Sequence, residues 1–259
     1  MPDARRRAYL QAMGIDLWRV RTEAEAPGPA LSDAAAPHRG PDNANTPAPL
    51  SPDSGRRLPS GAALDPGPAA LSWDALRSAV GVCTACGLHE TRTQTVFGVG
   101  DQNARLVVIG EAPGADEDRA GEPFVGRAGQ LLNAMLAAIG LAREQVYIAN
   151  IVKCRPPGNR DPHADEAAAC QPYLHRQIAL LAPDVILAVG RVSAHNLLGT
   201  EEAVGRLRGR AHRFDPGDIP LIVTYHPAYL LRRPHDKAKA WQDLQAVYRL
   251  LHAEPPEAG

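Results

Sequence analysis

Long apolar runs are missing from this 259-residue sequence, and cysteine is scarce. No run approaches the roughly 20 apolar residues that cross a bilayer, which excludes a transmembrane protein. The segment from Met1 to Leu10 carries arginines but no apolar signal core, so we expect a cytoplasmic, bacterial protein. Four cysteines are too few for a disulfide scaffold, but they are enough for one metal site.

Net charge is also nearly absent, because 28 Lys and Arg residues face 29 Asp and Glu residues. Only Lys153, Lys237 and Lys239 are lysines. A near-zero sum argues against a strongly basic nucleic-acid binder, but it does not exclude a local basic patch.

The N-terminal quarter lacks the residues of a hydrophobic core. From Ala26 to Ala70 there are 10 Pro, 11 Ala and 5 Gly, but no Val, Ile, Met, Phe, Tyr or Trp. Such a stretch cannot offset the entropy of ordering, so we predict a disordered linker over 23–70. Residues 1–22 carry apolar side chains at helical spacing, which predicts an amphipathic helix that packs on the domain or docks on a protein partner.

The remaining segment, 71–255, alternates short apolar runs with amphipathic ones, which predicts an α/β domain. The predicted strands are Arg105–Gly110, Val146–Val152, Asp184–Gly190 and Pro220–Pro227. The predicted helices are Gly129–Gly140, Asp165–Ala182, Ser193–Leu198 and Asp236–His252. Strands separated by helices form a parallel sheet, whose ligand crevice lies at the carboxyl ends of the strands.

Three of the four predicted strand ends carry distinctive residues. After the first comes a loop, Gly110–Gly129, with five glycines and two prolines. Asn150 lies near the end of the second strand, and His226 lies at the end of the fourth. A glycine-rich turn before a helix offers free backbone N–H groups to an anion, but this loop matches neither a dinucleotide nor a nucleoside triphosphate motif.

The four cysteines are Cys83, Cys86, Cys154 and Cys170. A C-x-x-C pair brings two thiolates together, but the spacing does not repeat as in a zinc ribbon. Four thiolates suit zinc or an iron–sulfur cluster, and spacing alone leaves the metal open. The alternative is a dithiol pair with two buried structural cysteines.

Together these motifs resemble the family 4 uracil-DNA glycosylases. The resemblance rests on GEAPGADED with GEPFVGRAG, on Asn150 ahead of VKCRPP, on the four cysteines, and on HPAYLLR, and it covers roughly 73–251. It implies a three-layer α/β/α fold with a central four-stranded parallel sheet. It further implies a [4Fe-4S] cluster on Cys83, Cys86, Cys154 and Cys170, and removal of uracil from DNA.

The resemblance also implies roles for individual residues. Phe124 matches an aromatic ring that stacks on the flipped base, and Asn150 matches the residue that reads uracil. His226 would stabilise the departing uracil anion, and Glu111 would orient water or stabilise the cationic sugar. The further substrate-binding candidates are the backbone positions Gly110, Ala112 and Gly114. The plainer alternatives are core filling for Phe124, a turn residue at Asn150 and a structural histidine at 226.

DNA contacts are expected from the C-terminal third. From Arg191 to Lys239 there are nine basic and five acidic residues, a pattern typical of a phosphate-binding patch or of a solvated face. In HPAYLLR, Leu230 or Leu231 resembles the wedge that fills the space of the flipped base, and Arg232 follows them.

We therefore predict a monomeric, monofunctional, base-flipping uracil-DNA glycosylase that acts on single- or double-stranded uracil-containing DNA. The covalently crosslinking branch of the superfamily is disfavoured, because 152–162 lacks its basic insertion ending in a histidine. The alternative from another class is a non-catalytic iron–sulfur DNA-binding accessory of a DNA polymerase. A zinc nucleotide hydrolase is disfavoured because no cluster of histidines that would hold a zinc-bound water is visible.

Overall fold

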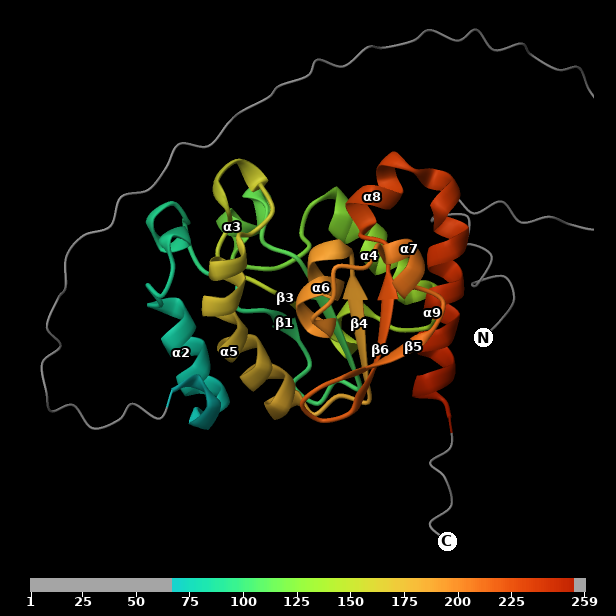
Figure 1. Ribbon diagram of the computed structural model, residues 1–259, viewed down its shortest axis with the longest axis horizontal. Coiled ribbons are helices and arrows are strands. Elements are labelled where there is room, and N and C mark those ends of the chain that lie inside the picture. The colour runs from blue at the N-terminus through green and yellow to red at the C-terminus, as the bar shows by residue number, and fades with distance from the viewer. Residues whose placement is uncertain (1–66, 254–259) are drawn as a thin grey trace, which may run out of the picture. The chain divides into compact units, whose positions relative to one another are not determined.

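A computed structural model describes residues 67–253 of the chain (Figure 1). The predicted helix over 1–22 and nearly all of the predicted linker lie outside these residues. Within the described part, Pro68–Ala70, the last residues of the stretch predicted as linker, form a short 3-10 helix, η1. None of the helices in 67–253 is long and apolar enough to cross a membrane.

The centre of the domain is a six-stranded sheet with the order β1-β3-β2-β4-β6-β5. Its strands are β1 (Val99–Gly100), β2 (Leu106–Gly110), β3 (Tyr147–Asn150), β4 (Val185–Val189), β5 (Ala211–Phe214) and β6 (Ile219–Thr224). The inner four, β3, β2, β4 and β6, pair in parallel, as predicted. Sequence analysis missed β1 and β5, which pair antiparallel at the two edges.

Helices surround this sheet and connect its strands. They are α2 (Trp73–Gly81), α3 (Ala115–Ala120), α4 (Arg127–Ala138), α5 (Ala164–Leu181), α6 (Arg191–Leu198), α7 (Val204–Leu207), α8 (Pro227–Arg232) and α9 (Lys237–Leu251). The remaining 3-10 helices are η2 (Gly87–Glu90), η3 (Arg143–Gln145), η4 (Pro157–Asn159) and η5 (Pro234–Asp236).

The two faces of the sheet carry separate hydrophobic cores. Val108 and Leu187 point toward α4 and α9, whereas Val107 and Ile186 point toward α5 and α6. Because successive residues of a strand face opposite sides, β2 and β4 are buried along their whole length, and this explains their continuous apolar sequences. The three-layer α/β/α fold is confirmed, with α9 on one flank and α5 on the other in Figure 1.

Candidate active site

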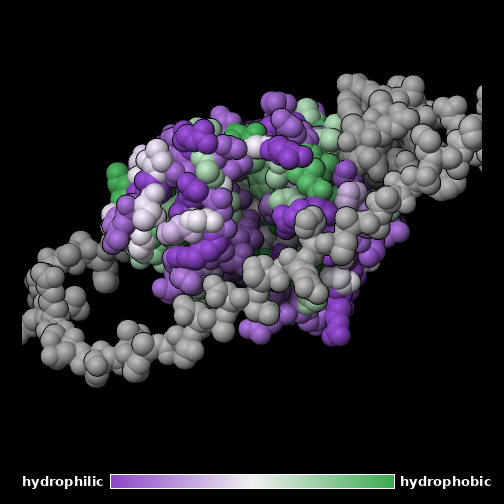
Figure 2. Space-filling view, turned by 90° about the horizontal axis from the view of Figure 1, so that it is seen from above, coloured by the Kyte–Doolittle hydropathy of each residue, from purple (hydrophilic) through white to green (hydrophobic). Residues whose placement is uncertain are grey.

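A cavity of about 790 Å³ opens at the carboxyl ends of the parallel strands. This volume falls within the range of ligand pockets, roughly 300–1,000 Å³. Seen from above, this face of the molecule is hollowed, and hydrophilic residues gather around the hollow (Figure 2). The pocket is lined by Glu111, Ala112, Gly114, Glu117, Phe124, Ala128, Asn150, Asn159, Asp161, Gly190, Arg191, Val204, Gly205, Tyr225, His226, Ala228, Tyr229 and Arg232.

The glycine-rich loop after β2 forms one wall of the pocket. Glu117 ties this loop together: its carboxylate accepts hydrogen bonds from the backbone N–H groups of Gly114, Val125 and Gly126, at 3.1, 3.0 and 3.3 Å. The N–H of Gly114 is therefore engaged inside the loop and is not free for a substrate. Asp118 is buried and accepts from the N–H of Thr93, so these acidic residues hold the loop by hydrogen bonds.

Gly110 lies behind the pocket and not in its lining. A Cβ atom at this position would lie 2.4 Å from the Asn150 Oδ1 and 2.7 Å from the Phe124 ring. Only glycine therefore lets these two side chains approach the end of β2.

Phe124 lies in the pocket wall with its backbone in the left-handed region, at φ 55°. Non-glycine residues adopt this conformation at a cost, and such strain persists where the surroundings impose it. Arg143 donates to the carbonyl oxygens of Pro123 and Phe124, and a Cβ at Gly129 would lie 1.7 Å from the Phe124 carbonyl. Phe124 is 7% exposed, and it belongs to a hydrophobic core while it lines the cavity.

Asn150 ends β3 and is 2% exposed. Its Oδ1 is one of the buried side-chain atoms in the described residues that have no hydrogen-bond partner. Buried polar atoms are nearly always paired, so an unpaired carboxamide oxygen in a pocket is typical of a ligand-binding group. The buried Lys153 supports the strand end from behind, because its Nζ donates to the Asn150 carbonyl at 3.0 Å.

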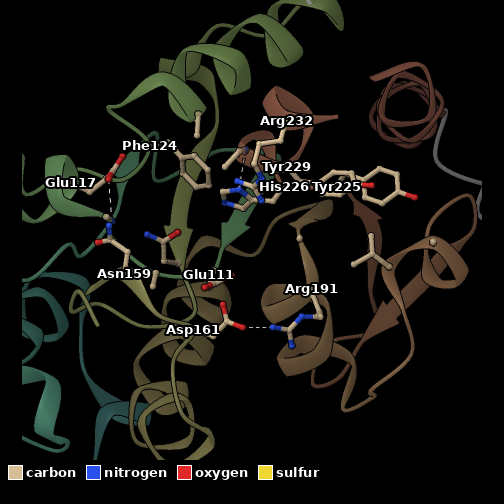
Figure 3. Close-up of a pocket in the computed structure, with 18 residues that line it drawn as sticks. Glu111, Glu117, Phe124, Asn159, Asp161, Arg191, Tyr225, His226, Tyr229 and Arg232 are labelled. Atoms are coloured by element: carbon tan, nitrogen blue, oxygen red, sulfur yellow. Dashed lines mark hydrogen bonds and ion pairs between the residues drawn. The ribbon is translucent and has the colours of Figure 1, made fainter. Parts of the chain in front are cut away.

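His226 is the residue that precedes α8, and its ring lies 5.6 Å from the Phe124 ring, centroid to centroid (Figure 3). Burial, with a contribution from the charge of Arg232, lowers the pKa of His226 to about 4. Its Nδ1 accepts a hydrogen bond from the N–H of Ala228. A neutral imidazole that accepts at Nδ1 carries its proton on Nε2, so the ring is a neutral donor at Nε2.

Glu111 follows β2 and shares the pocket with two residues that sequence analysis missed, Asp161 and Arg191. Arg191 forms an ion pair with Asp161, and Asp161 lies beside Glu111 in the pocket (Figure 3). Burial, the negative charge of Asp161 and hydrogen bonding to its carboxyl group raise the pKa of Glu111 to about 7, while the charge of Arg191 lowers it. Arg191 directly follows the Gly190 that ends the third predicted strand, which is the one strand end where no functional residue was assigned.

The four cysteines come together around a second, smaller cavity, which also contacts Arg92 and Lys153. The Arg92 guanidinium donates to the Cys154 Sγ at 3.0 Å, and the backbone N–H of Lys153 donates to the Cys170 Sγ at 3.3 Å. All four are free thiols, and in residues 67–253 no group of three His, Cys, Asp or Glu side chains is arranged to hold a metal ion. Four cysteine sulfurs around one cavity are nevertheless the ligand set of a four-thiolate site, which suits an iron–sulfur cluster or zinc.

The uracil DNA glycosylase superfamily model matches residues 97–245 of the chain. The chain is 44% identical to the type-4 uracil-DNA glycosylase of Archaeoglobus fulgidus over 180 residues, which are 67% of this chain and 90% of that protein. The chain belongs to the uracil-DNA glycosylase superfamily. It is also 43% identical to the type-4 enzyme of Pyrobaculum aerophilum over 172 residues, covering 64% of this chain and 88% of that protein. With the type-4 enzyme of Thermotoga maritima it shares 47% identity over 151 residues, covering 58% and 78% respectively. The predicted resemblance to the type-4 branch is confirmed.

In this member of the uracil-DNA glycosylase superfamily, the two candidate wedge leucines differ sharply in exposure. Leu230 is 1% exposed and packs in a hydrophobic core, which disfavours Leu230 as the residue that contacts DNA. Leu231 is 37% exposed, and the neighbouring Arg232 lines the pocket.

The basic patch predicted for this uracil-DNA glycosylase superfamily member is smaller than the sequence indicated. Arg208 is nearly buried and pairs with Asp243, which also accepts a hydrogen bond from Thr224 of β6, so Arg208 supports the fold. Arg210 and Arg213 pair with exposed carboxylates. Within the described residues no ion pair holds Arg206, Arg232 or Arg233.

Proposed function

We propose that this chain excises uracil from DNA by hydrolysing the bond between the base and its deoxyribose. The observation that carries the proposal is the buried, unpaired Oδ1 of Asn150 in a pocket that also holds the Phe124 ring and His226. The type-4 relatives named above, which cover most of this domain, support it.

Recognition of uracil follows from the chemistry of these side chains. Uracil presents an N3–H donor beside its O4 acceptor, and the Asn150 carboxamide offers an acceptor and a donor in one plane. Cytosine presents the inverse pattern, which would leave buried polar atoms unpaired at a cost of roughly 1–3 kcal/mol each. A base inside a duplex does not reach such a pocket, so we infer that uracil is flipped out of the stack onto Phe124.

The reaction breaks the bond between uracil N1 and the sugar C1′, and the electron pair stays on the base. Negative charge develops on uracil O2, where the Nε2–H of His226 donates, while positive charge develops on the sugar. The oxygen of a water molecule then bonds to C1′, and the ionised Glu111 carboxylate orients this water and takes its proton. No lysine lines the pocket, so we assign water as the nucleophile and no lyase step.

We infer that Cys83, Cys86, Cys154 and Cys170 hold a [4Fe-4S] cluster. The N–H donors at Cys154 and Cys170 suit anionic sulfur ligands, and the four residues come from three separate segments of the chain. None of the four lines the larger pocket. The cluster would therefore connect the segment before β1 to the loop after β3 and to the helix α5. It would stabilise the fold and take no part in bond cleavage.

DNA binding is assigned to the pocket rim, with Arg232 on a phosphate and Leu231 as the wedge. The alternative of a non-catalytic accessory to a polymerase is disfavoured. A protein that only binds DNA does not need a buried carboxamide oxygen without a hydrogen-bond partner. Such an atom lowers the stability of the fold unless a ligand forms the missing hydrogen bond.

The direct test is incubation of the purified chain with uracil-containing oligonucleotides, single- and double-stranded, followed by alkali. We expect strand cleavage at uracil only after alkali, and no cleavage of matched oligonucleotides with thymine or cytosine at that position. Absence of abasic sites on every uracil substrate would contradict the proposed activity, and cleavage without alkali would contradict the monofunctional assignment.

A further inference from the structure

Two carboxyl groups from different loops meet on the side of the pocket opposite Phe124 and His226. Glu111 follows β2, and Asp161 lies between η4 and α5. Figure 3 shows Asp161 between Glu111 and the Arg191 guanidinium, all three at the pocket. The two carboxyl groups are neighbours in the pocket (Figure 3), and Arg191 pairs with the far side of Asp161.

Two neighbouring carboxylates repel each other, so the pair favours a state in which one of the two groups holds a proton. The surroundings decide which group keeps the proton. Asp161 is exposed and has an arginine beside it, which favours its ionised form. Glu111 is half-buried, and desolvation is the first of the causes that raise the pKa of its carboxyl group to about 7.

Asp161 is itself fixed in place from its N-terminal side. The neighbouring Arg160 donates to the Asp161 carbonyl at 3.0 Å and makes two hydrogen bonds to the carboxylate of Glu166, at 2.8 and 2.6 Å. Glu166 also accepts from the N–H of His163 at the start of α5. The backbone that carries Asp161 is thus anchored to a long helix, so this side chain projects from a rigid support.

We propose that Asp161 and Arg191 are positioning residues for Glu111: Arg191 holds Asp161 in place, and Asp161 orients the Glu111 side chain and sets its state of charge. This inference rests on the proposed function of Glu111 in handling water. Glu111 acts there in its ionised form, so Asp161 keeps it a strong base near neutral pH, and Arg191 prevents its pKa from rising further.

The other charged or titratable groups around the pocket are Glu117 of α3, Tyr225 after β6, and His226, Tyr229 and Arg232 at α8. The buried Lys153 lies behind the end of β3. Substitutions at Asp161 and Arg191 leave all of these unchanged, so their effects report on the Glu111 carboxyl group.

The test is the pH dependence of single-turnover uracil excision by the full chain and by the variants Asp161→Asn and Arg191→Gln. In the unmodified chain we expect the rate to rise with pH up to a midpoint near the Glu111 pKa of about 7. Loss of the Asp161 charge should move this midpoint down by roughly 1 pH unit, and loss of the Arg191 charge should move it up. A role in folding alone would not shift the midpoint in opposite directions.

The chain provides a matched control pair, Arg105 with Asp184. Arg105 precedes β2 and Asp184 precedes β4, so this ion pair lies at the amino ends of the strands, away from the pocket. Its side chains are 61% and 48% exposed, against 56% and 58% for Arg191 and Asp161. Arg105→Gln and Asp184→Asn should leave the midpoint unchanged. Equal midpoints in all variants, or shifts of one sign at Asp161 and Arg191, would overturn the proposal.

A second measurement does not depend on activity. Titration of the Glu111 carboxyl carbon by NMR in the DNA-free chain, assigned by comparison with Glu111→Gln, should show the same opposite shifts. If no uracil is excised but these titration shifts occur, the proposed function fails while the charge relationship holds. If the Glu111 titration is the same in all variants, the positioning role is overturned whatever the activity.

Discussion

The backbone N–H of Ala228 donates a hydrogen bond to the Nδ1 of His226, at 3.1 Å. This single contact fixes the tautomer of a buried ring whose pKa is lowered to about 4, and it leaves Nε2 as the atom that carries the proton. The donor in the pocket is therefore a neutral imidazole over the whole physiological pH range.

A first prediction concerns this donor. His226→Ala should slow single-turnover uracil excision by roughly 10²–10³-fold, the usual cost of losing one donor to a developing anion. His226→Gln, which keeps an N–H donor, should lose less. Equal losses in the two variants would show that the ring acts through its shape and not through its hydrogen bond.

The lowered pKa of His226 also predicts a pH effect on stability. Because the folded-state pKa, about 4, lies below the unfolded value of 6.5, the unfolded chain binds more protons between these values. The stability from keeping the ring neutral is fully present above pH 6.5 and is lost as the pH falls toward 4. Compared with His226→Gln, the unmodified chain should therefore lose more thermal stability between pH 7 and pH 4.5, which calorimetry measures. Parallel curves for the two proteins would contradict the depressed pKa.

Gly110 gives a prediction about Asn150, the residue that we propose recognises uracil. In Gly110→Ala the new methyl group would meet the Asn150 Oδ1 and the Phe124 ring, at 2.4 and 2.7 Å, so one of them must shift. We expect at least a tenfold loss of excision with a modest change in melting temperature. Gly81→Ala is the control, since a Cβ there has no atom within 4 Å and the position is helical. Full activity in Gly110→Ala would show that the two side chains tolerate displacement.

The adjacent leucines of α8 form a matched pair for DNA contact. Leu230→Ala should lower the free energy of unfolding by about 2–5 kcal/mol, because it leaves a cavity in the core, and denaturant titration measures this loss. Leu231→Ala should leave stability nearly unchanged but slow excision from double-stranded DNA more than from single-stranded DNA, since only a duplex needs its gap filled. A uniform slowing on both substrates would argue against a wedge.

The cysteine cavity predicts a visible chromophore. The chain purified without oxygen should be brown and contain about four iron atoms, as expected for one [4Fe-4S] cluster on four thiolates. The variant Cys154→Ser should lose colour, iron and thermal stability. The control variant Leu231→Ala, which keeps all four cysteines, should retain all three. A colourless protein containing one zinc ion would refute the cluster.

The sheet could be predicted from sequence because its inner strands are continuous apolar runs, which only a strand buried on both faces requires. The edge strands could not. β1 has two residues, and β5 carries the polar His212 and Arg213, so neither stands out from a loop. Their pairing depends on neighbours that the local sequence does not reveal.

Asn150 and His226 were predicted at strand ends from single motifs, and the structure places both in the lining of one pocket. Asp161 and Arg191 were missed because they approach Glu111 only in the folded chain. Asp161 and Glu111 are fifty residues apart, and no local sequence pattern connects them. The two leucines show the same limit. Helix phase decides which of two neighbours is buried, and a six-residue helix is too short for periodicity to fix that phase.

The glycine-rich loop combines a backbone conformation that Phe124 would not adopt alone with a carboxylate, Glu117, that binds three of its N–H groups. The ring is thus ordered when the protein folds, before any DNA arrives. If uracil is flipped onto Phe124 as proposed, the nucleotide bears the cost of its own unstacking and immobilisation, while the surface that receives it is already arranged. A preformed pocket of this kind would select uracil against normal bases as the base enters it.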